Sequence, residues 1–148
     1  MAIDPNLQRQ RANASLERGV AYIHRKQWQQ AASALQNALT ESPQSIPVHY
    51  HLAFCFANTG NALRARRLLE DALAFAHIDD AWRVRLLRLL ARVSMQANDY
   101  ALAAECLETA VAITGIGGAP ILNQLAQVFC KSGDFERGFE LFVKAMPR

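Results

Sequence analysis

Hydrophobic residues recur along this chain at spacings of three and four positions rather than two. That spacing keeps them on one face of a helix with 3.6 residues per turn, whereas a half-buried strand alternates apolar and polar positions. One arrangement occurs four times: a small residue, a large one four positions later, and an alanine three further on. The copies are Ala31, Leu35, Ala38; Ala65, Leu69, Ala72; Ala103, Leu107, Ala110; and Gly138, Phe142, Ala145. The pattern predicts an all-α chain.

A second marker precedes each copy of the first and repeats at the same interval. It joins a small residue to the residue three positions later, as in Gly19 with Tyr22, Ala53 with Phe56, Ala91 with Ser94, and Ala126 with Phe129. Successive copies of both markers are 34, 38 and 35 residues apart. A nearly constant period of this length is typical of stacked supersecondary units rather than of one globular core. Each unit is predicted to be a pair of helices.

Turn-forming residues separate the two halves of each unit. Lys26-Gln27, Gly60-Asn61, Asn98-Asp99 and Gly133-Asp134 stand at these points. Gly or Asn can end a helix in the left-handed conformation, and a following Asp or Asn can cap the next helix. Asp4 is the expected cap of the first helix, and Asp79 and Asp80 are expected to cap the fifth rather than to form a catalytic pair. The predicted helices span about 5–25, 28–41, 47–59, 62–75, 80–97, 99–113, 119–131 and 135–146.

These residues resemble the tetratricopeptide repeat. The resemblance rests on the helix pair of about 34 residues, the small-then-aromatic first helix, and the aromatic residues Trp28, Tyr100 and Phe135 that open second helices. The sequence departs from the family pattern at Arg18, Ala62, Ser94 and Gly138. The resemblance implies a right-handed α-solenoid in one domain, 1–148, with repeats at about 12–45, 46–79, 84–117 and 119–148. It also implies a protein that binds peptides in its concave groove.

Composition narrows the function classes. The chain has 148 residues, of which 51% are hydrophobic and 20% charged, so it is expected to fold. Its net charge of +3 does not require a nucleic acid as partner, although it would attract an acidic peptide. No apolar run approaches the roughly 18 residues that cross a bilayer, and the start lacks the layout of a secretory signal. We therefore expect a cytoplasmic protein without membrane insertion.

Candidate chemistry is sparse. The three cysteines are widely spaced within apolar segments, which predicts buried thiols in a reducing compartment rather than disulfides or a metal pair. His49 and His51 point about 200° apart on a helix, so they are poorly placed to share a metal. No spacing supports a nucleophile with its base. The chain is therefore predicted to be neither an enzyme nor a carrier of a metal or cofactor.

Two stripes of residues are predicted to form the ligand groove. An apolar stripe lies on the first and third helices, and a basic stripe begins on the fifth and continues as polar residues on the seventh. Arg can hold a carboxylate bidentately, so the expected ligand carries apolar anchors and acidic groups. The alternatives are a solvated arginine face and packing of the apolar stripe on a terminal helix. The predicted residues are Leu16, Val20, Ile23, Tyr50, Phe54, Arg85, Arg88, Arg92, Met95, Gln127 and Lys131.

The last helix is unusually apolar for the end of a repeat array, which normally carries a polar outer face. Phe142 and Ala145 are expected to face their partner helix, which leaves Phe139 and Met146 directed outward. A partner or second subunit covers them, the native protein continues beyond Arg148, or the edge is simply exposed.

The functional prediction is an adaptor or chaperone that holds a peptide segment of a partner. The alternative is a structural module that self-assembles through the last helix. A third reading, nucleic-acid binding through the arginines, predicts a steep loss of affinity with salt.

Overall fold

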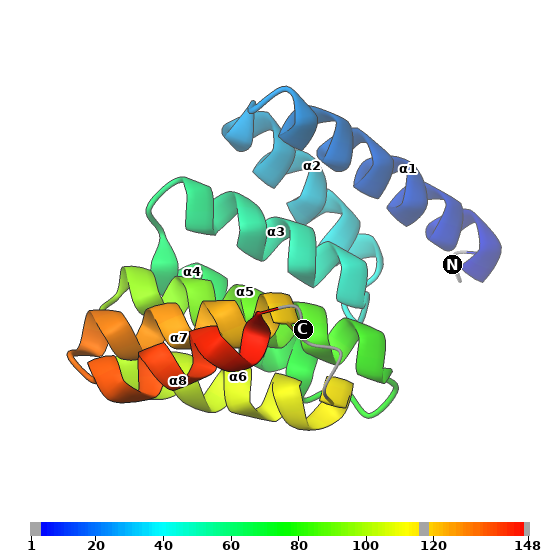
Figure 1. Ribbon diagram of the computed structural model, residues 1–148. Helices are drawn as coiled ribbons and strands as arrows, with labels where there is room; N and C mark the ends of the chain where they lie inside the picture. The colour runs from blue at the N-terminus through cyan, green and yellow to red at the C-terminus, as the bar shows by residue number, and fades with distance from the viewer. Residues whose placement is uncertain (1–3, 116–118, 147–148) are drawn as a thin grey trace. The chain divides into compact units, whose positions relative to one another are not determined.

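The computed structural model describes residues 4–115 and 119–146, and the regular structure within them is helical (Figure 1). Every helix end lies within two residues of its predicted position, so the predicted all-α fold of helix pairs is confirmed. The helices are α1 (Pro5–His24), α2 (Trp28–Glu41), α3 (Ile46–Asn58), α4 (Ala62–Leu73), α5 (Asp80–Gln96), α6 (Tyr100–Thr114), α7 (Ala119–Ser132) and α8 (Phe135–Ala145).

The chain forms two compact units, Met1–Ile78 and Asp79–Arg148, called unit 1 and unit 2 below. In unit 1, α1 packs on α2, α2 on α3, and α3 on α4. In unit 2, α5 packs on α6, α6 on α7, and α7 on α8. Each unit therefore contains two of the four predicted repeats (Figure 1).

The small residues of both markers lie where helices approach each other most closely, as the sequence predicts. All eight are buried. At Gly19, a Cβ atom would lie 2.6 Å from the Cγ atom of Leu35, so this position of α1 has no room for a side chain unless Leu35 moves. The close approach of the two helices brings many atom pairs within range of dispersion attraction, which is weak for each pair and large in sum. The eight are Gly19, Ala31, Ala53, Ala65, Ala91, Ala103, Ala126 and Gly138.

The turns inside the repeats each place one residue in the left-handed conformation. The φ angles are 59° at Lys26, 78° at Gly60, 60° at Asn98 and 97° at Gly133. Gly adopts this region without steric cost and Asn tolerates it, whereas a lysine there is less common. The predicted helix breaks are therefore confirmed, including the one at Lys26.

Aspartate caps begin four helices. The side chains of Asp4, Asp79, Asp99 and Asp134 each accept a hydrogen bond from a backbone N–H of the helix that follows. The expected cap at Asn61 is wrong, because the Asn61 side chain makes no such bond at the start of α4. A carboxylate offers two acceptor oxygens in this position, whereas an amide offers only one.

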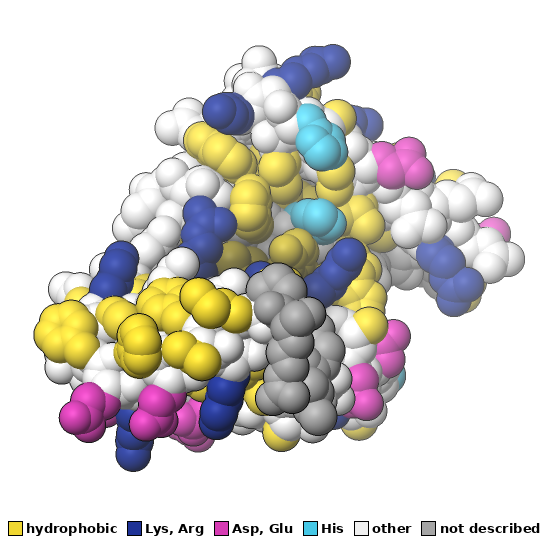
Figure 2. Space-filling model, viewed as in Figure 1, with side chains coloured by type: hydrophobic (Ala, Val, Ile, Leu, Met, Phe, Trp, Pro, Cys, Tyr) yellow, Lys and Arg dark blue, Asp and Glu magenta, His cyan; other side chains and the backbone are white. Residues whose placement is uncertain are grey.

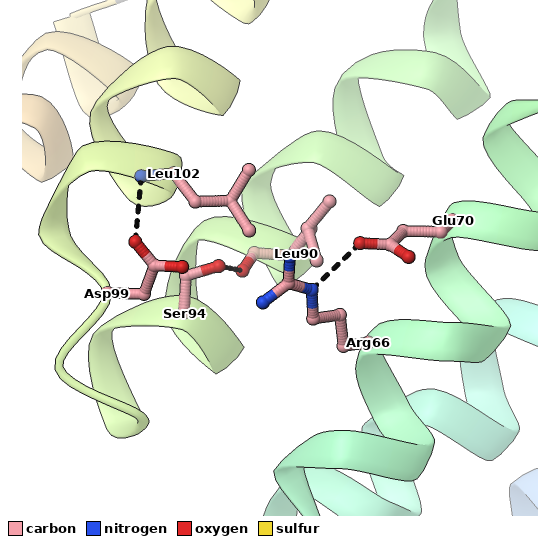
Figure 3. A network of polar contacts seen from close by, with 6 residues as sticks. All are labelled: Arg66, Glu70, Leu90, Ser94, Asp99 and Leu102. Atoms are coloured by element: carbon pink, nitrogen blue, oxygen red, sulfur yellow. Dashed lines mark hydrogen bonds and ion pairs between the residues drawn. The ribbon is translucent and has the colours of Figure 1, made fainter.

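Ser94 explains how the third repeat accommodates a departure from the family pattern. Its side chain is buried, and its Oγ donates a hydrogen bond to the backbone oxygen of Leu90, one turn earlier in α5, at 2.7 Å. Burying a hydroxyl costs free energy unless it is hydrogen-bonded, and this bond satisfies it. Figure 3 shows the bond, the nearby Asp99 cap on Leu102, and the Arg66–Glu70 ion pair along α4.

The cysteines are free thiols. Cys55 and Cys106 are buried as predicted, while Cys130 is only half-buried. Burial raises the pKa of the Cys55 thiol from its ordinary 9.0 to about 11. At neutral pH this thiol is therefore protonated, and the thiolate that reacts with electrophiles is scarce.

We predict that iodoacetamide at pH 8 modifies Cys130 before Cys55, and that Cys55 reacts only when the chain unfolds. Mass spectrometry of the separated peptides measures both rates in one sample, so Cys130 serves as the internal control. Because the unfolded chain releases the Cys55 proton above pH 9 while the folded chain keeps it, this group also lowers the free energy of unfolding as the pH rises from 9 towards 11. Equal rates for the two thiols would contradict the prediction.

The buried alanines give a test of the close packing. Ala103 in α6 is fully buried and Ala101, two residues earlier, is exposed. Ala103→Leu is expected to overpack the helix contact and to cost about 1 to 3 kcal/mol of unfolding free energy. Ala101→Leu should change it by less than about 0.5 kcal/mol. Urea unfolding followed by circular dichroism measures both, and equal midpoints would count against the packing described here.

Candidate functional site

The three predicted arginines lie along one side of α5. Arg85, Arg88 and Arg92 are exposed and follow the spacing of three and four that keeps side chains on one helical face. Between them, Leu86, Leu87, Leu89 and Leu90 are buried in unit 2. The Asp79 side chain starts the helix by accepting a hydrogen bond from the Trp82 N–H at 2.8 Å. Burial of the leucines therefore determines the direction in which the arginines point.

A reciprocal pair of hydrogen bonds links this face to α7. Arg88 Nε donates to Gln124 Oε1 at 3.1 Å, and Gln124 Nε2 donates to the backbone oxygen of Arg88 at 3.2 Å. The Gln124 side chain makes both bonds and the Arg88 side chain makes one, so these side chains are already restricted before a ligand arrives. The pair holds α5 and α7 in register beside a hollow in unit 2.

The hollow has a volume of about 270 Å³, space for one or two side chains of a ligand. It combines two cationic groups, three amides and two apolar side chains. Four of its members were predicted from the sequence: Arg92, Met95, Gln127 and Lys131. The complete lining is Arg92, Met95, Gln96, Gln124, Gln127, Val128 and Lys131.

Sequence analysis missed three members of this lining. Gln124 lies one turn before Gln127 and Val128, and Gln96 follows Met95. The helical spacing from Gln127 and Lys131 back to Gln124 was the available signal. Val128 is buried, so its contribution to the floor of the hollow depends on how α5 and α7 pack and has no signature in its own spacing.

Two of the predicted arginines lie outside the hollow. The Arg85 guanidinium carbon lies 5.0 Å from the centre of the Trp82 ring, a cation–π contact along α5. Arg88 is held by Gln124. The structure thus brings Arg92, but neither Arg85 nor Arg88, to the lining with Met95 and Lys131.

The apolar stripe of unit 1 is less separate from the core than the sequence suggested. Leu16 and Ile23 of α1 pack, together with Tyr22, against a buried cluster of α2 and α3. The physical reason is that α1 contacts α2 and also reaches α3, so a wide arc of its surface is covered. The buried cluster consists of Ala31, Leu35, Leu52 and Cys55.

The remaining apolar residues are half-buried. The Phe54 ring lies 5.9 Å from the Trp28 ring, and the Tyr50 ring meets the His51 ring edge-on at 5.2 Å. Val20 is half-buried on α1. These side chains retain partial exposure within unit 1 and are held by aromatic neighbours, which restricts their rotamers.

A second hollow, of about 320 Å³, lies among α6, α7 and α8 of unit 2. Its charges are mixed in sign, with Glu108 and Glu140 beside Arg137 and Lys144. The Arg137 guanidinium lies 5.6 Å from the Phe129 ring centre. Because the opposite charges offset each other, this hollow has no clear preference for a ligand charge.

The last helix presents large hydrophobic side chains to solvent. Phe139 is 69% exposed and Met146 is 65% exposed, whereas Phe142 and Ala145 are partly covered. Figure 2 shows hydrophobic side chains side by side over α8. The outward direction of these residues agrees with the sequence prediction, and their role in an interface stays a prediction.

Two further searches covered residues 4–115 and 119–146. Among them, no three His, Cys, Asp or Glu residues gather closely enough to hold a metal ion. In the same ranges, no helix combines the length and apolar character required to cross a membrane.

Comparison with known proteins supports the repeat architecture. Residues 22–83 match a family model described as tetratricopeptide repeat. Among curated proteins, none matches this sequence.

Solved structures are similar to this chain in fold. MamA 41-end from Desulfovibrio magneticus RS-1 has a TM-score of 0.80 at 18% identity, covering 91% of this chain and 73% of that chain. A second MamA structure gives 0.76 at 15%, covering 90% and 70%. PilW, described as a widely conserved type IV pilus biogenesis factor, gives 0.82 at 18%, covering 90% and 60%.

Identities this low show a common fold and nothing about a shared ligand. The matched region begins in the first repeat and continues through the second, and the same helix-pair markers recur in unit 2. Residues 22–83 thus match the tetratricopeptide repeat, and the helix pairs of the described residues give the chain a fold like that of tetratricopeptide repeat proteins.

Proposed function

We propose that the chain is a non-catalytic adaptor or chaperone that binds an extended segment of a partner protein. The observation that carries the proposal is the lining of the hollow between α5 and α7. Arg92 and Lys131 supply positive charge there, and Met95 and Val128 supply apolar surface. This combination fits a peptide in which an acidic group stands next to a hydrophobic side chain.

Each type of lining residue has a task in this proposal. Arg92 presents a planar guanidinium that can donate two parallel hydrogen bonds to one carboxylate, while Lys131 adds a compact charge. Gln127 carries an amide group that both donates and accepts, which suits the backbone of an extended peptide, whereas the Gln124 amide is bonded to Arg88. Met95 has a flexible thioether chain that can adapt to different apolar side chains. The hollow would thus select ligands by their charge and their overall shape.

The aromatic residues of unit 1 form a second candidate ligand surface, which belongs to that unit alone. Tyr50 and Phe54 lie one turn apart on α3 and are half-buried. Aromatic side chains contribute large contact area with little loss of conformational entropy. In this proposal they bind hydrophobic side chains of a partner. A cytoplasmic location and the absence of catalysis belong to the proposal as expectations.

The charge requirement can be tested with a fluorescein-labelled peptide that alternates leucine and aspartate and ends in a free carboxylate. We expect Arg92→Gln or Lys131→Gln to weaken its binding about tenfold, because each removes a charge-assisted hydrogen bond. The control variant is Arg67→Gln, which removes an exposed arginine of α4. Fluorescence anisotropy measures the affinities.

A second peptide with asparagine in place of aspartate should bind more weakly than the acidic probe. The difference should shrink at high salt, because salt screens exposed charges. Equal affinity for both peptides, or the same loss in Arg67→Gln as in Arg92→Gln, would count against the proposed acidic ligand.

The apolar requirement is tested at Tyr50. Tyr50→Ala should weaken binding of the acidic probe by about 1 to 3 kcal/mol if the ring is an anchor of the ligand. Leu63→Ala, which shortens an exposed side chain on α4, is the control and should leave affinity unchanged. Thermal unfolding checks that both variants are folded. Unaltered binding by folded Tyr50→Ala would remove α3 from the proposed surface.

A further inference from the structure

The outer face of α8 carries an apolar stripe, defined here as Phe135, Phe139, Val143 and Met146. Their exposed fractions are 69%, 69%, 50% and 65%. Spacings of four residues keep the first three on one side of the helix, and Met146 is the residue that follows its end. Apart from Leu7 and Leu63, they are the only large hydrophobic side chains classed as exposed within residues 4–115 and 119–146. Exposed large hydrophobic side chains are therefore concentrated at α8.

The equivalent positions of other second helices show how this face is packed elsewhere in the chain. Aligning the second helices by their Ala-Leu-Ala marker places the stripe at Trp28, Ala32, Gln36 and Leu39 in α2. Of these, Trp28, Ala32 and Leu39 pack against the buried cluster that includes Leu52 and Cys55 of α3. On α2, this face is covered by another helix.

The same alignment can be made for α6 in unit 2. The equivalent positions of α6 are Tyr100, Ala104, Glu108 and Val111, and α6 packs on α7. Tyr100, Ala104 and Val111 are half-buried, and Glu108 is exposed. The stripe of α8 therefore occupies the positions that lie beside the next helix in both units.

Two positions distinguish α8 from these covered helices, and the second of the stripe is Ala32 in α2 and Ala104 in α6 but Phe139 in α8. The third position of the stripe is Gln36 in α2 and Glu108 in α6, both exposed, but Val143 in α8. A repeat face that meets only water usually carries polar residues. In α8 a valine stands where α2 and α6 have a polar residue. This face of α8 is therefore more apolar than the equivalent face of α2 or α6, which another helix covers.

We propose that α8 packs against α8 of a second copy of this chain in an antiparallel, two-fold arrangement. Most homo-oligomers have closed symmetry in which the same patch is used by both copies. About an axis near the middle of the stripe, Phe139 lies opposite Val143 of the second copy, and Phe135 lies near its Met146. Each contact then joins a large ring to a smaller or more flexible side chain, and the helix dipoles run in opposite directions.

Charges beside the stripe agree with this arrangement. Glu136 and Glu140 follow Phe135 and Phe139 on one flank of the helix, and Lys144 follows Val143. Antiparallel pairing places this flank, whose Glu140 and Lys144 also line the hollow among α6, α7 and α8, beside the same flank of the second copy. A parallel pair would instead place these charges beside the flank of Gly138, which is buried in its own unit.

The size of the stripe predicts a concentration-dependent dimer. At the exposures given above, its side chains present roughly 400 Å² per copy, so two copies bring together about 800 Å² before the polar rim is counted. This is below the roughly 1,200 Å² of stable specific interfaces and corresponds to a weak, transient one. We therefore expect a reversible equilibrium between one and two copies.

Sedimentation velocity of the full chain over about a hundredfold range of concentration tests the proposal. The average mass should rise from 16.4 kDa toward twice that value. Phe139→Glu should raise the dissociation constant by about tenfold or more, because it buries an unpaired charge against an apolar surface. Val143→Glu is the second variant, at a less exposed position, and should act in the same direction.

Leu63→Glu is the matched control, because Leu63 is 62% exposed on α4 and lies outside the stripe. It should dimerise like the unaltered chain, and circular dichroism should show all variants folded. A chain that stays at one copy over the whole range overturns the proposal and leaves the stripe to a helix of a different protein. Dimerisation of folded Phe139→Glu at the unaltered affinity overturns it as well.

This dimer is independent of peptide binding, since the stripe shares no residue with the hollow lined by Arg92 and Lys131. The Phe139→Glu variant should bind the leucine-aspartate probe with unaltered affinity. Failure of the dimer and failure of the peptide proposal are therefore distinguishable in the same set of proteins.

Discussion

Close contact between helix backbones at small residues is the constraint on which the rest of this structure depends. Gly19 against Leu35 is the clearest case, since even one added carbon would meet the leucine at 2.6 Å. Buried alanines at Ala53, Ala91 and Ala126 occupy the same place in the other repeats. Close packing of this kind resists changes in volume, so each helix pair is a stiff element that can hold surface side chains in fixed directions.

The candidate ligand site follows from that stiffness. Burial of one face of α5 leaves its arginines on the other side, and the Arg88–Gln124 hydrogen bonds tie α5 to α7 beside the hollow. The hollow thus depends on packing between first helices of successive repeats as well as on the residues that line it. The apolar stripe of α8 has the same origin, because it is the packing face of a repeat without its following helix among the described residues.

Much of the fold was predictable from the sequence, because helix formation here depends on local periodicity and on Gly, Asn and Asp at the turns. The positions of Lys26, Asn98 and Gly133 were recognised as helix breaks before their left-handed conformation was visible. The site was predictable only in part. Arg92 and Lys131 belong to helices whose faces can be worked out one by one, but the pairing of Arg88 with Gln124, 36 residues away, depends on how two helices pack.

The sequence by itself determined the number of helices, their ends and the small residues that let them touch, since each of these depends on neighbours within a few positions. The tertiary structure decided which exposed groups share a surface. It places Met95 and Val128 in the lining of one hollow, packs Leu16 and Ile23 against the core of unit 1, and leaves Phe139 exposed to solvent. The physical reason is that burial and proximity are properties of two packed elements, whereas periodicity is a property of one.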